Sequence, residues 1–276
     1  MPVLCYRVIE YDYRPADAPP VLRVVCTTSP GTTSIRQVIR STFPGVELAE
    51  PSGGLLAMFS DQEDILLGGN LPPEDEMERL LGLMTRVLTV QDACDISHCL
   101  DFYRYPEETD QSPEEWPYTP TGGRLKQAKY KGIRSAAAVL EDALVDFVTG
   151  HPGLARCDAV AAMPRSTQHG DRPDWPPLWA SAIADALGAK RVALQRTRPT
   201  RPQKDIEDLE ERTRNQRGSM VADTTASGRS VLVVDDLYMQ GDSMEEAARA
   251  LRESGATSVF GLCIAKTVKG CRAYPF

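Results

Sequence analysis

No apolar run in this sequence approaches the ~18 residues that a membrane-spanning helix requires. The opening residues, MPVLCYRVIEYDYRP, lack a basic segment followed by a continuous apolar segment, so we expect no secretion signal. The seven cysteines are odd in number and scattered along the chain, which is typical of reduced thiols. These absences predict a cytoplasmic protein with no membrane partner.

Positive charge is scarce. The 31 lysines and arginines are outnumbered by 39 aspartates and glutamates, which gives a net charge of −8. Broad binding to nucleic acid or to an anionic membrane is therefore disfavoured, because both carry negative charge. We do not expect nucleic acid as a partner, although the composition does not exclude a specific contact.

Metal-ligating residues are also sparse. The stretch CDISHC places Cys94, His98 and Cys99 close together, but structural zinc favours four ligands in spaced pairs. No second pair is visible in the sequence, and His151 and His169 have no evident partner. The sequence therefore does not predict a zinc centre.

The chain is long enough for one large hydrophobic core or two modest ones, since 42% of its 276 residues are hydrophobic. Its best candidate boundary is the segment 106–123, which is rich in proline, glycine and acidic residues and has no helical or strand period. We therefore predict two domains, 1–115 and 116–276. In the first, the patterns predict strands at 3–10, 21–27 and 54–59 and helices at 33–43 and 73–88.

After the boundary, apolar strands and amphipathic helices alternate. Helices are predicted in GIRSAAAVLEDALVDFVTG, PPLWASAIADALG and GDSMEEAARALRESG, and strands in CDAVAAM, RVAL, SVLVVDD and SVFGLCIA. The strands show no polar alternation, so both faces of their sheet should be covered. The sequence thus predicts an α/β fold with a mainly parallel sheet.

Two carboxylates, Asp235 and Asp236, follow the apolar run Val231 to Val234 at the end of a predicted central strand. Ligands of such folds bind beyond the carboxyl ends of the strands. Adjacent carboxylates repel each other in a partly desolvated site, and a sugar diol or a cation would relieve that cost. The alternative is that the pair only solvates a turn. A receiver domain is excluded, because it needs several further strands and only about forty residues follow.

The segment VDDLYMQGDS, between a strand and a helix, resembles the phosphoribosyl-pyrophosphate (PRPP) motif of type I phosphoribosyltransferases. RLKQAKYKG (124–132) is similar to the basic segment that opens ComF-like phosphoribosyltransferases. The segment 196–220, with its PQ pair and its RNQRG ending, resembles their polar loop. The resemblance spans about 124–268 and implies a doubly wound sheet of the type I phosphoribosyltransferase kind, preceded by a smaller α/β region.

The resemblance implies roles for the acidic pair and the loop that follows it. Asp235 and Asp236 would hold the ribose hydroxyls of PRPP and, directly or indirectly, Mg²⁺ as the cofactor. The 5′-phosphate would lie against backbone N–H groups at the N-terminus of the helix. The residues of this phosphate loop are Met239, Gln240, Gly241, Asp242 and Ser243.

The resemblance also implies a pyrophosphate loop and a lid. AMPRST (162–167) matches the pyrophosphate loop in position, with Arg165 and Ser166 as its contacts. An ordinary surface arginine is the alternative for Arg165. The lid would be 196–217, whose Arg198, Arg201 and Lys204 would face the pyrophosphate; a solvated charged helix at 205–217 is the alternative.

The phosphate loop departs from the Thr-Thr-Gly-Ala-Thr that the family usually has, losing two hydroxyls and gaining the carboxylate of Asp242. Two functions therefore stay open: a phosphoribosyltransferase that acts on a nucleobase or related amine, and a non-catalytic PRPP or nucleotide sensor or ComF-like DNA-uptake protein. Residues 1–115 would be a hood over the acceptor, a partner-binding module or a homodimer surface. Ser243 and Glu246 have the spacing of a capping box.

Trp175 and Trp179 lie one helical turn apart beside the predicted crevice. They could stack on a base, but we expect them to pack between helices.

Overall fold

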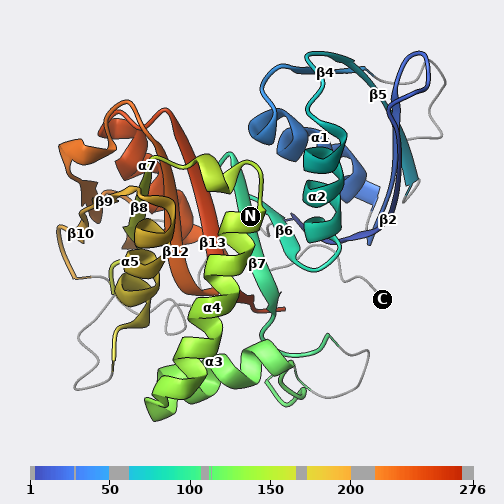
Figure 1. Cartoon of the computed structure of the whole chain (residues 1–276). Coiled ribbons are helices and arrows are strands. Elements are labelled where there is room, and N and C mark those ends of the chain that lie inside the picture. The colour runs from blue at the N-terminus through green and yellow to red at the C-terminus, as the bar shows by residue number, and fades with distance from the viewer. Residues whose placement is uncertain are drawn as a thin grey trace.

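A seven-stranded sheet forms the centre of the molecule (Figure 1). The computed structural model describes residues 4–27, 29–49, 62–106, 112, 114–165, 173–199 and 215–268. In spatial order the strands are β1 (Leu4–Tyr6), β6 (Leu88–Gln91), β7 (Ile96–Phe102), β13 (Ser258–Lys266), β12 (Ser230–Tyr238), β8 (Ala159–Ala162) and β9 (Lys190–Val192). The five strands from β7 to β9 pair in parallel, whereas β6 is antiparallel to both β1 and β7.

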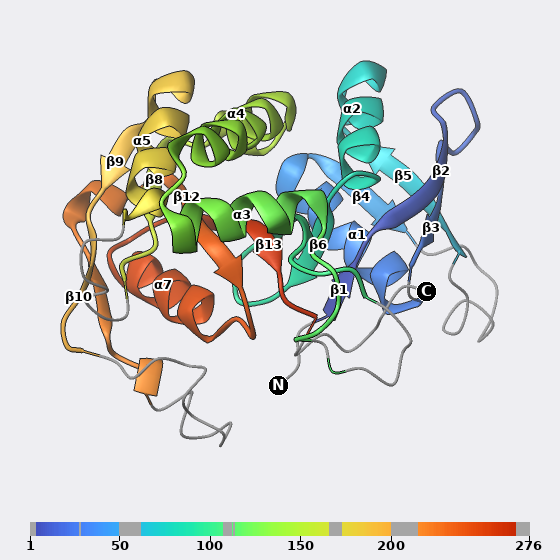
Figure 2. The same cartoon turned by 90° about the horizontal axis from the view of Figure 1, so that it is seen from below.

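Helices cover both faces of this sheet (Figure 2). On one face lie α3 (Pro120–Lys131), α4 (Arg134–Gly150) and α5 (Trp175–Leu187), and on the other lies α7 (Asp242–Glu253). Successive residues of β12 face opposite sides of the sheet. Leu232 and Val234 pack in the core on the side of α3, α4 and α5, whereas Val231 and Val233 pack in the core on the side of α7. The predicted α/β class and mainly parallel sheet are confirmed.

A second, smaller sheet lies beside the large one (Figure 1). Its antiparallel strands are, in spatial order, β2 (Val8–Arg14), β3 (Val21–Cys26), β5 (Gln62–Gly69) and β4 (Val46–Ala49). Helices α1 (Ser29–Thr42) and α2 (Glu74–Met84) pack against this sheet. Within the described ranges, the short elements are the hairpin of β10 (Leu194–Arg196) and β11 (Met220–Ala222) and two single-turn helices, Leu154–Arg156 and Thr224–Ala226.

The large sheet takes strands from both sides of the predicted boundary at residue 115. β1, β6 and β7 come from before it, and β7 pairs directly with β13 near the other end of the chain. The division into domains 1–115 and 116–276 stays a prediction, but the first region contributes to the central sheet. The expected strand 54–59 lies outside the described residues.

The prediction that 106–123 lacks regular structure is wrong at its C-terminal end, because α3 begins at Pro120. The Thr119 side chain caps this helix by accepting a hydrogen bond from Gly122 N (2.9 Å), and Pro120 occupies its first position. Threonine and proline in this order form a helix-start signal. The acidic, proline-rich context of these two residues favours a loop, but the helix-start signal prevails.

Candidate functional site

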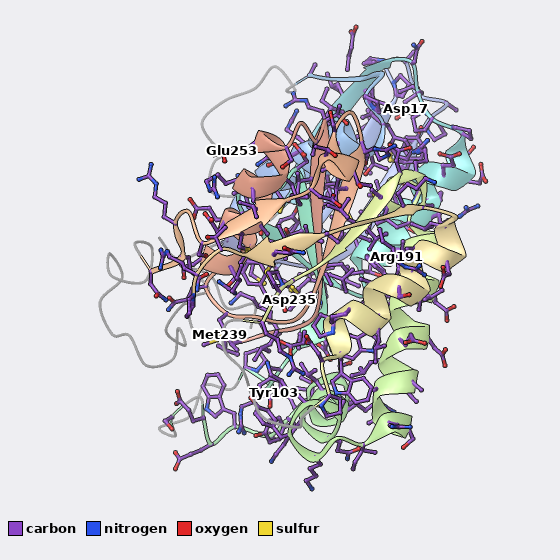
Figure 3. The ribbon with its side chains drawn as sticks, turned by 90° about the vertical axis from the view of Figure 1, so that its left-hand side faces the viewer. Asp17, Tyr103, Arg191, Asp235, Met239 and Glu253 are labelled. Carbon is purple, nitrogen blue, oxygen red and sulfur yellow. The ribbon has the colours of Figure 1, made fainter. Side chains whose placement is uncertain are left out.

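Asp235 and Asp236 lie where β12 continues beyond its neighbour β8. Val234 is the last residue of β12 that pairs with β8, opposite Ala162, and β12 then runs on to Tyr238 beside β13. The two carboxylates therefore stand at the carboxyl edge of the sheet, where α/β folds bind ligands. Figure 3 shows Asp235 close to the loop of Met239.

The acidic pair is poorly solvated and only partly neutralised. The Asp236 backbone N–H donates to Asp235 Oδ1 (2.7 Å), and Lys129 Nζ forms an ion pair with Asp236 Oδ1 (2.8 Å). Burial first, and the neighbouring Asp236 charge second, raise the pKa of Asp235 to about 7, against the attraction of Lys129 and Arg196. This carboxyl is therefore protonated far more readily than an exposed aspartate.

Lys129 is a site residue that the sequence pattern did not predict. It lies on α3, within the basic segment 124–132, and reaches the acidic pair across the end of the sheet. Burial disfavours its charge, but the attraction of Asp236 outweighs burial and raises the pKa of Lys129. The signal in the sequence was the basic segment, in which nothing distinguished Lys129 from its neighbouring lysines.

The loop between β12 and α7 surrounds a small pocket of about 70 Å³. Residues 237–244 and Asp235 line this pocket, so it extends from Asp235 to the N-terminus of α7. Gly241 has a φ of 99°, which favours glycine and turns the chain sharply into the helix. Lys266 Nζ donates to Met239 O (2.7 Å) and so holds the loop. All five predicted phosphate-loop residues line the pocket.

The expected capping box of Ser243 and Glu246 is wrong. Gly241 is the N-cap residue of α7, and no side chain caps the helix there. Glu246 instead accepts the backbone N–H of Met220 (2.9 Å) in β11 and two hydrogen bonds from Arg249. Because β11 approaches α7 only in the folded chain, the pattern Ser-x-x-Glu was not sufficient to predict this partner.

The loop after β8 begins beside the acidic pair, since Met163 N donates to Val234 O (2.9 Å). The Arg165 guanidinium forms an ion pair with Asp174 at 2.9 Å. Arg196, at the start of the predicted lid, donates through Nε to the carbonyls of Pro164 (3.2 Å) and Arg165 (2.8 Å). The pyrophosphate loop and the lid are thus joined at their bases. Ser166 lies outside the described residues.

The predicted lid is described only near its two ends. Arg196 Nη1 donates to Gln216 Oε1 (2.9 Å), and Arg198 Nη2 donates to Arg217 O (3.1 Å), so the ends lie side by side. Arg201 and Lys204 lie outside the described residues. Their proposed contact with pyrophosphate stays a prediction.

The three possible zinc ligands do not meet. His98 and Cys99 are successive residues of β7, so they face opposite sides of the sheet; Cys94 and Cys99 belong to the α7-side core, whereas His98 packs on Phe147 of α4. Within the described ranges, no group of three or more His, Cys, Asp or Glu side chains could hold a metal ion.

Trp175 and Trp179 pack between helices, as predicted. Both are buried, and their indole N–H groups donate to Ala128 O (2.9 Å) and Ala137 O (3.2 Å). Among the helices of the described residues, none combines the length and the apolar character needed to cross a bilayer.

No protein family matches the chain, and no curated protein does. Among solved structures it is similar to phosphoribosylpyrophosphate synthetase from Mycobacterium smegmatis, with 19% identity, a TM-score of 0.32, and coverage of 46% of this chain and 33% of that one. The orotate phosphoribosyltransferase of Aeropyrum pernix shows 22% identity, a TM-score of 0.33 and coverage of 51% and 64%. The glutamine PRPP amidotransferase of B. subtilis shows 14% identity, a TM-score of 0.36 and coverage of 88% and 46%.

The structural neighbours are thus type I phosphoribosyltransferases and related PRPP proteins. The aligned regions span less than two thirds of each of these three neighbours.

Proposed function

We propose that the chain is a phosphoribosyltransferase-like enzyme that uses Mg²⁺-PRPP, or in reverse a nucleotide and pyrophosphate, with a nucleobase or related amine as acceptor. The observation that carries the proposal is that Asp235 of the acidic pair lines the same pocket as the residues at the start of α7. Carboxylates suit ribose hydroxyls, and the free N–H groups of a helix N-terminus suit a phosphate. PRPP carries both ribose hydroxyls and a 5′-phosphate on one sugar.

Each part of the site has a role in this reaction. Asp235 and Asp236 accept hydrogen bonds from the ribose hydroxyls and fix the ring as its anomeric carbon gains positive charge. The backbone N–H groups of the loop 239–243 hold the 5′-phosphate. Arg165 contacts the departing pyrophosphate after exchanging its ion pair with Asp174, and Arg198, Arg201 and Lys204 close over it.

The acidic pair is suited to Mg²⁺, which binds proteins through one or two carboxylates and takes its other ligands from water and phosphate oxygens. The raised pKa of Asp235 reflects a carboxyl whose charge is not fully compensated, and a cation would compensate it. Bound there, Mg²⁺ would neutralise charge on the leaving group. Asp235 and Asp236 are its proposed ligands, directly or through water.

The loop sequence favours a second candidate, a protein that binds PRPP or a nucleotide without turnover, such as a sensor or a ComF-like protein of DNA uptake. Asp242 is the first residue of α7 and lines the phosphate pocket. A carboxylate about 4 Å from one phosphate charge opposes binding by roughly 4 kcal/mol at an effective dielectric near 20. A site built in this way would bind phosphate less tightly.

The test is a turnover screen with Mg²⁺-PRPP and a panel of bases, following pyrophosphate release. We expect release with at least one acceptor, and at least a tenfold loss in Asp235→Asn and in Asp236→Asn, because each removes a charge that holds the ribose. Asp142→Asn, at an exposed position of α4, is the matched control and should keep full activity.

Full activity in both variants of the pair would contradict the roles of Asp235 and Asp236. Calorimetric binding of PRPP or a nucleotide without release from any acceptor would favour the sensor.

A further inference from the structure

A second and larger pocket adjoins the acidic site. Its volume is about 310 Å³, and it lies among the end of β7, helix α3 and the residues that follow β13. Met239 lines both this pocket and the small one beside Asp235. Figure 3 shows Asp235, Met239 and Tyr103 in succession along one side of the molecule. A group bound here would therefore lie next to a ribose held by the acidic pair.

The walls of the pocket are fixed by close backbone packing. A Cβ added at Gly122 would lie 1.8 Å from Tyr103 O, so only glycine allows α3 to approach the end of β7 this closely. The Tyr103 N–H donates to Lys266 O (2.8 Å), and the Thr119 hydroxyl donates to Phe102 O (2.5 Å). The pocket is thus built into the fold, where β7, α3 and β13 meet.

Three tyrosines supply its aromatic surface. The rings of Tyr103 and Tyr118 meet edge to face, with centroids 5.1 Å apart and an interplanar angle of 81°. Tyr130 lines the pocket from α3 and is 49% exposed. Aromatic faces of this kind stack on a planar ring, and their hydroxyls can bond to its polar edge.

Two cations, Arg104 and Lys126, also line the pocket. The Arg104 guanidinium carbon lies 3.8 Å from the centre of the Tyr118 ring, and Lys126 Nζ lies 4.3 Å from it. Neither side chain forms an ion pair with a carboxylate of the described residues. Glu114 is the one acidic residue among the described lining residues, so two positive charges face one negative charge.

We propose that this pocket binds the acceptor, and that the acceptor is a planar aromatic ring bearing a carboxylate. This inference rests on the proposed function and narrows its substrate class. The ring stacks against Tyr103 and Tyr130, and the carboxylate pairs with Lys126 beside Arg104, which covers the Tyr118 ring. A carboxylate is favoured because it would give the half-buried Lys126 ammonium a charge-assisted hydrogen bond, which the Tyr118 ring does not supply.

The test is equilibrium dialysis with the full chain in the presence of Mg²⁺ and ribose 5-phosphate, which lacks the pyrophosphate leaving group. Nicotinate and nicotinamide share a ring and differ in charge, whereas benzoate and cyclohexanecarboxylate share a charge and differ in aromaticity. We expect nicotinate to bind at least tenfold more tightly than nicotinamide, and benzoate at least fivefold more tightly than cyclohexanecarboxylate. Equal affinities within either pair would overturn the proposal.

Variants on one helix locate the binding. Lys126→Met and Tyr130→Ala should each weaken nicotinate binding at least fivefold, and Lys126→Met should change nicotinamide binding by less than twofold. Lys131→Met is the matched control, because Lys131 is exposed on α3 and does not line the pocket. Nicotinate binding that all three variants retain would place the ligand elsewhere and overturn the proposal.

The failure of this inference can be distinguished from failure of the proposed function. Pyrophosphate release that depends on Asp235 but is unchanged in Lys126→Met and Tyr130→Ala would retain the proposed function and overturn the pocket assignment. Carboxylate binding that is lost in these variants, without release from any acceptor, would retain the pocket as a binding site and contradict the proposed function.

Discussion

At the scale of single residues, the defining feature of the site is that the negative charges of Asp235 and Asp236 have few compensating positive charges near them. Lys129 forms an ion pair with Asp236, whereas Asp235 accepts a hydrogen bond from the backbone N–H of Asp236. A carboxyl in such surroundings is more easily kept neutral than charged, because desolvation penalises the charged form. The folded chain therefore carries an electrostatic cost at its candidate site, which a bound cation or diol would offset.

Replacing Asp235 by asparagine should stabilise the ligand-free protein at alkaline pH. The pKa of Asp235 is 3.8 in its unperturbed state and about 7 when folded, so between these values the folded state binds more protons than the unfolded state. The free energy of unfolding contributed by this group therefore falls as pH rises from 3.8 to 7. Asp235→Asn should raise the free energy of unfolding at pH 8 and should not raise it at pH 4.

Urea denaturation at these two pH values measures the effect, with Asp142→Asn as the control. A loss of stability in Asp235→Asn at pH 8 would show that the charged carboxylate stabilises the fold.

At the scale of elements, α7 supports two parts of the site. Its N-terminus forms the phosphate pocket, and one turn further on the carboxylate of Glu246 accepts the N–H of Met220 from the β10–β11 hairpin. Arg249 binds Glu246 through two hydrogen bonds and donates a third to Met220 O (2.9 Å). Burial opposes the charge of Glu246, but the bonds from Arg249 and Met220 outweigh it and lower its pKa.

Removing this carboxylate should destabilise the fold much more than removing its neighbour. Glu246→Ala leaves the Met220 N–H and the Arg249 guanidinium without their acceptor, and such losses cost about 1–3 kcal/mol. Glu245→Ala, at an exposed position of the same helix, should change stability by less than about 0.5 kcal/mol. Chemical denaturation of both variants is the measurement, and equal values would exclude a structural role for the Glu246 network.

At the scale of the whole molecule, two buried histidines lie where the central sheet and α4 approach helix α1 of the smaller sheet. The rings of His98 on β7 and His151 after α4 lie 5.2 Å apart, both beside Phe147. The next turn of the chain contacts α1, since Arg156 donates to Thr42 O (3.0 Å). Burial lowers the pKa of His98 to about 3 and also lowers that of His151. Both rings are therefore neutral in the folded protein at neutral pH.

The protein should lose stability in mild acid because of these two rings. Below pH 6.5 the unfolded state takes up protons that the folded state excludes, so the free energy of unfolding falls as pH falls, and it does so down to about pH 3 for His98. Between pH 6.5 and pH 5, His98 alone accounts for about 2 kcal/mol. His98→Gln should be less stable than the native chain at pH 7, and the difference should shrink by that amount at pH 5.

Urea unfolding at both pH values provides the comparison. A constant difference between the two proteins would mean that the His98 ring takes up its proton equally well in the folded state.

Much of the central fold could be predicted from local pattern. The unbroken apolar run Val231 to Val234 predicted a central strand, and all four residues are buried. The amphipathic segment GDSMEEAARALRESG predicted helix α7, which buries Met244, Ala247, Ala248 and Leu251. Gly188 ends α5 in the left-handed conformation, as expected for a helix stop. These features depend on residues close together in the sequence, so their periodicity was enough.

Pairings between distant segments could not be predicted in this way. Strand β7 was not predicted, because nothing in ISHCLDF indicates that it pairs with β13 more than 150 residues later. Glu246 has the spacing of a capping residue, but its carboxylate accepts the N–H of Met220 in β11 instead. The folded chain brings β11 against α7, and this tertiary contact overrides the local preference.

The sequence by itself determined the α/β class, the main strand and helix of the site, and the placement of two carboxylates before a glycine turn. Those features follow from side-chain periodicity and backbone preference, which act over a few residues. Only the tertiary structure decided that Lys129 neutralises Asp236, that Arg196 joins two loops, and that three tyrosines and two cations form a pocket beside Met239. The charges and rings of these groups act over a few ångströms, and the distances between distant segments exist only once the sheet has assembled.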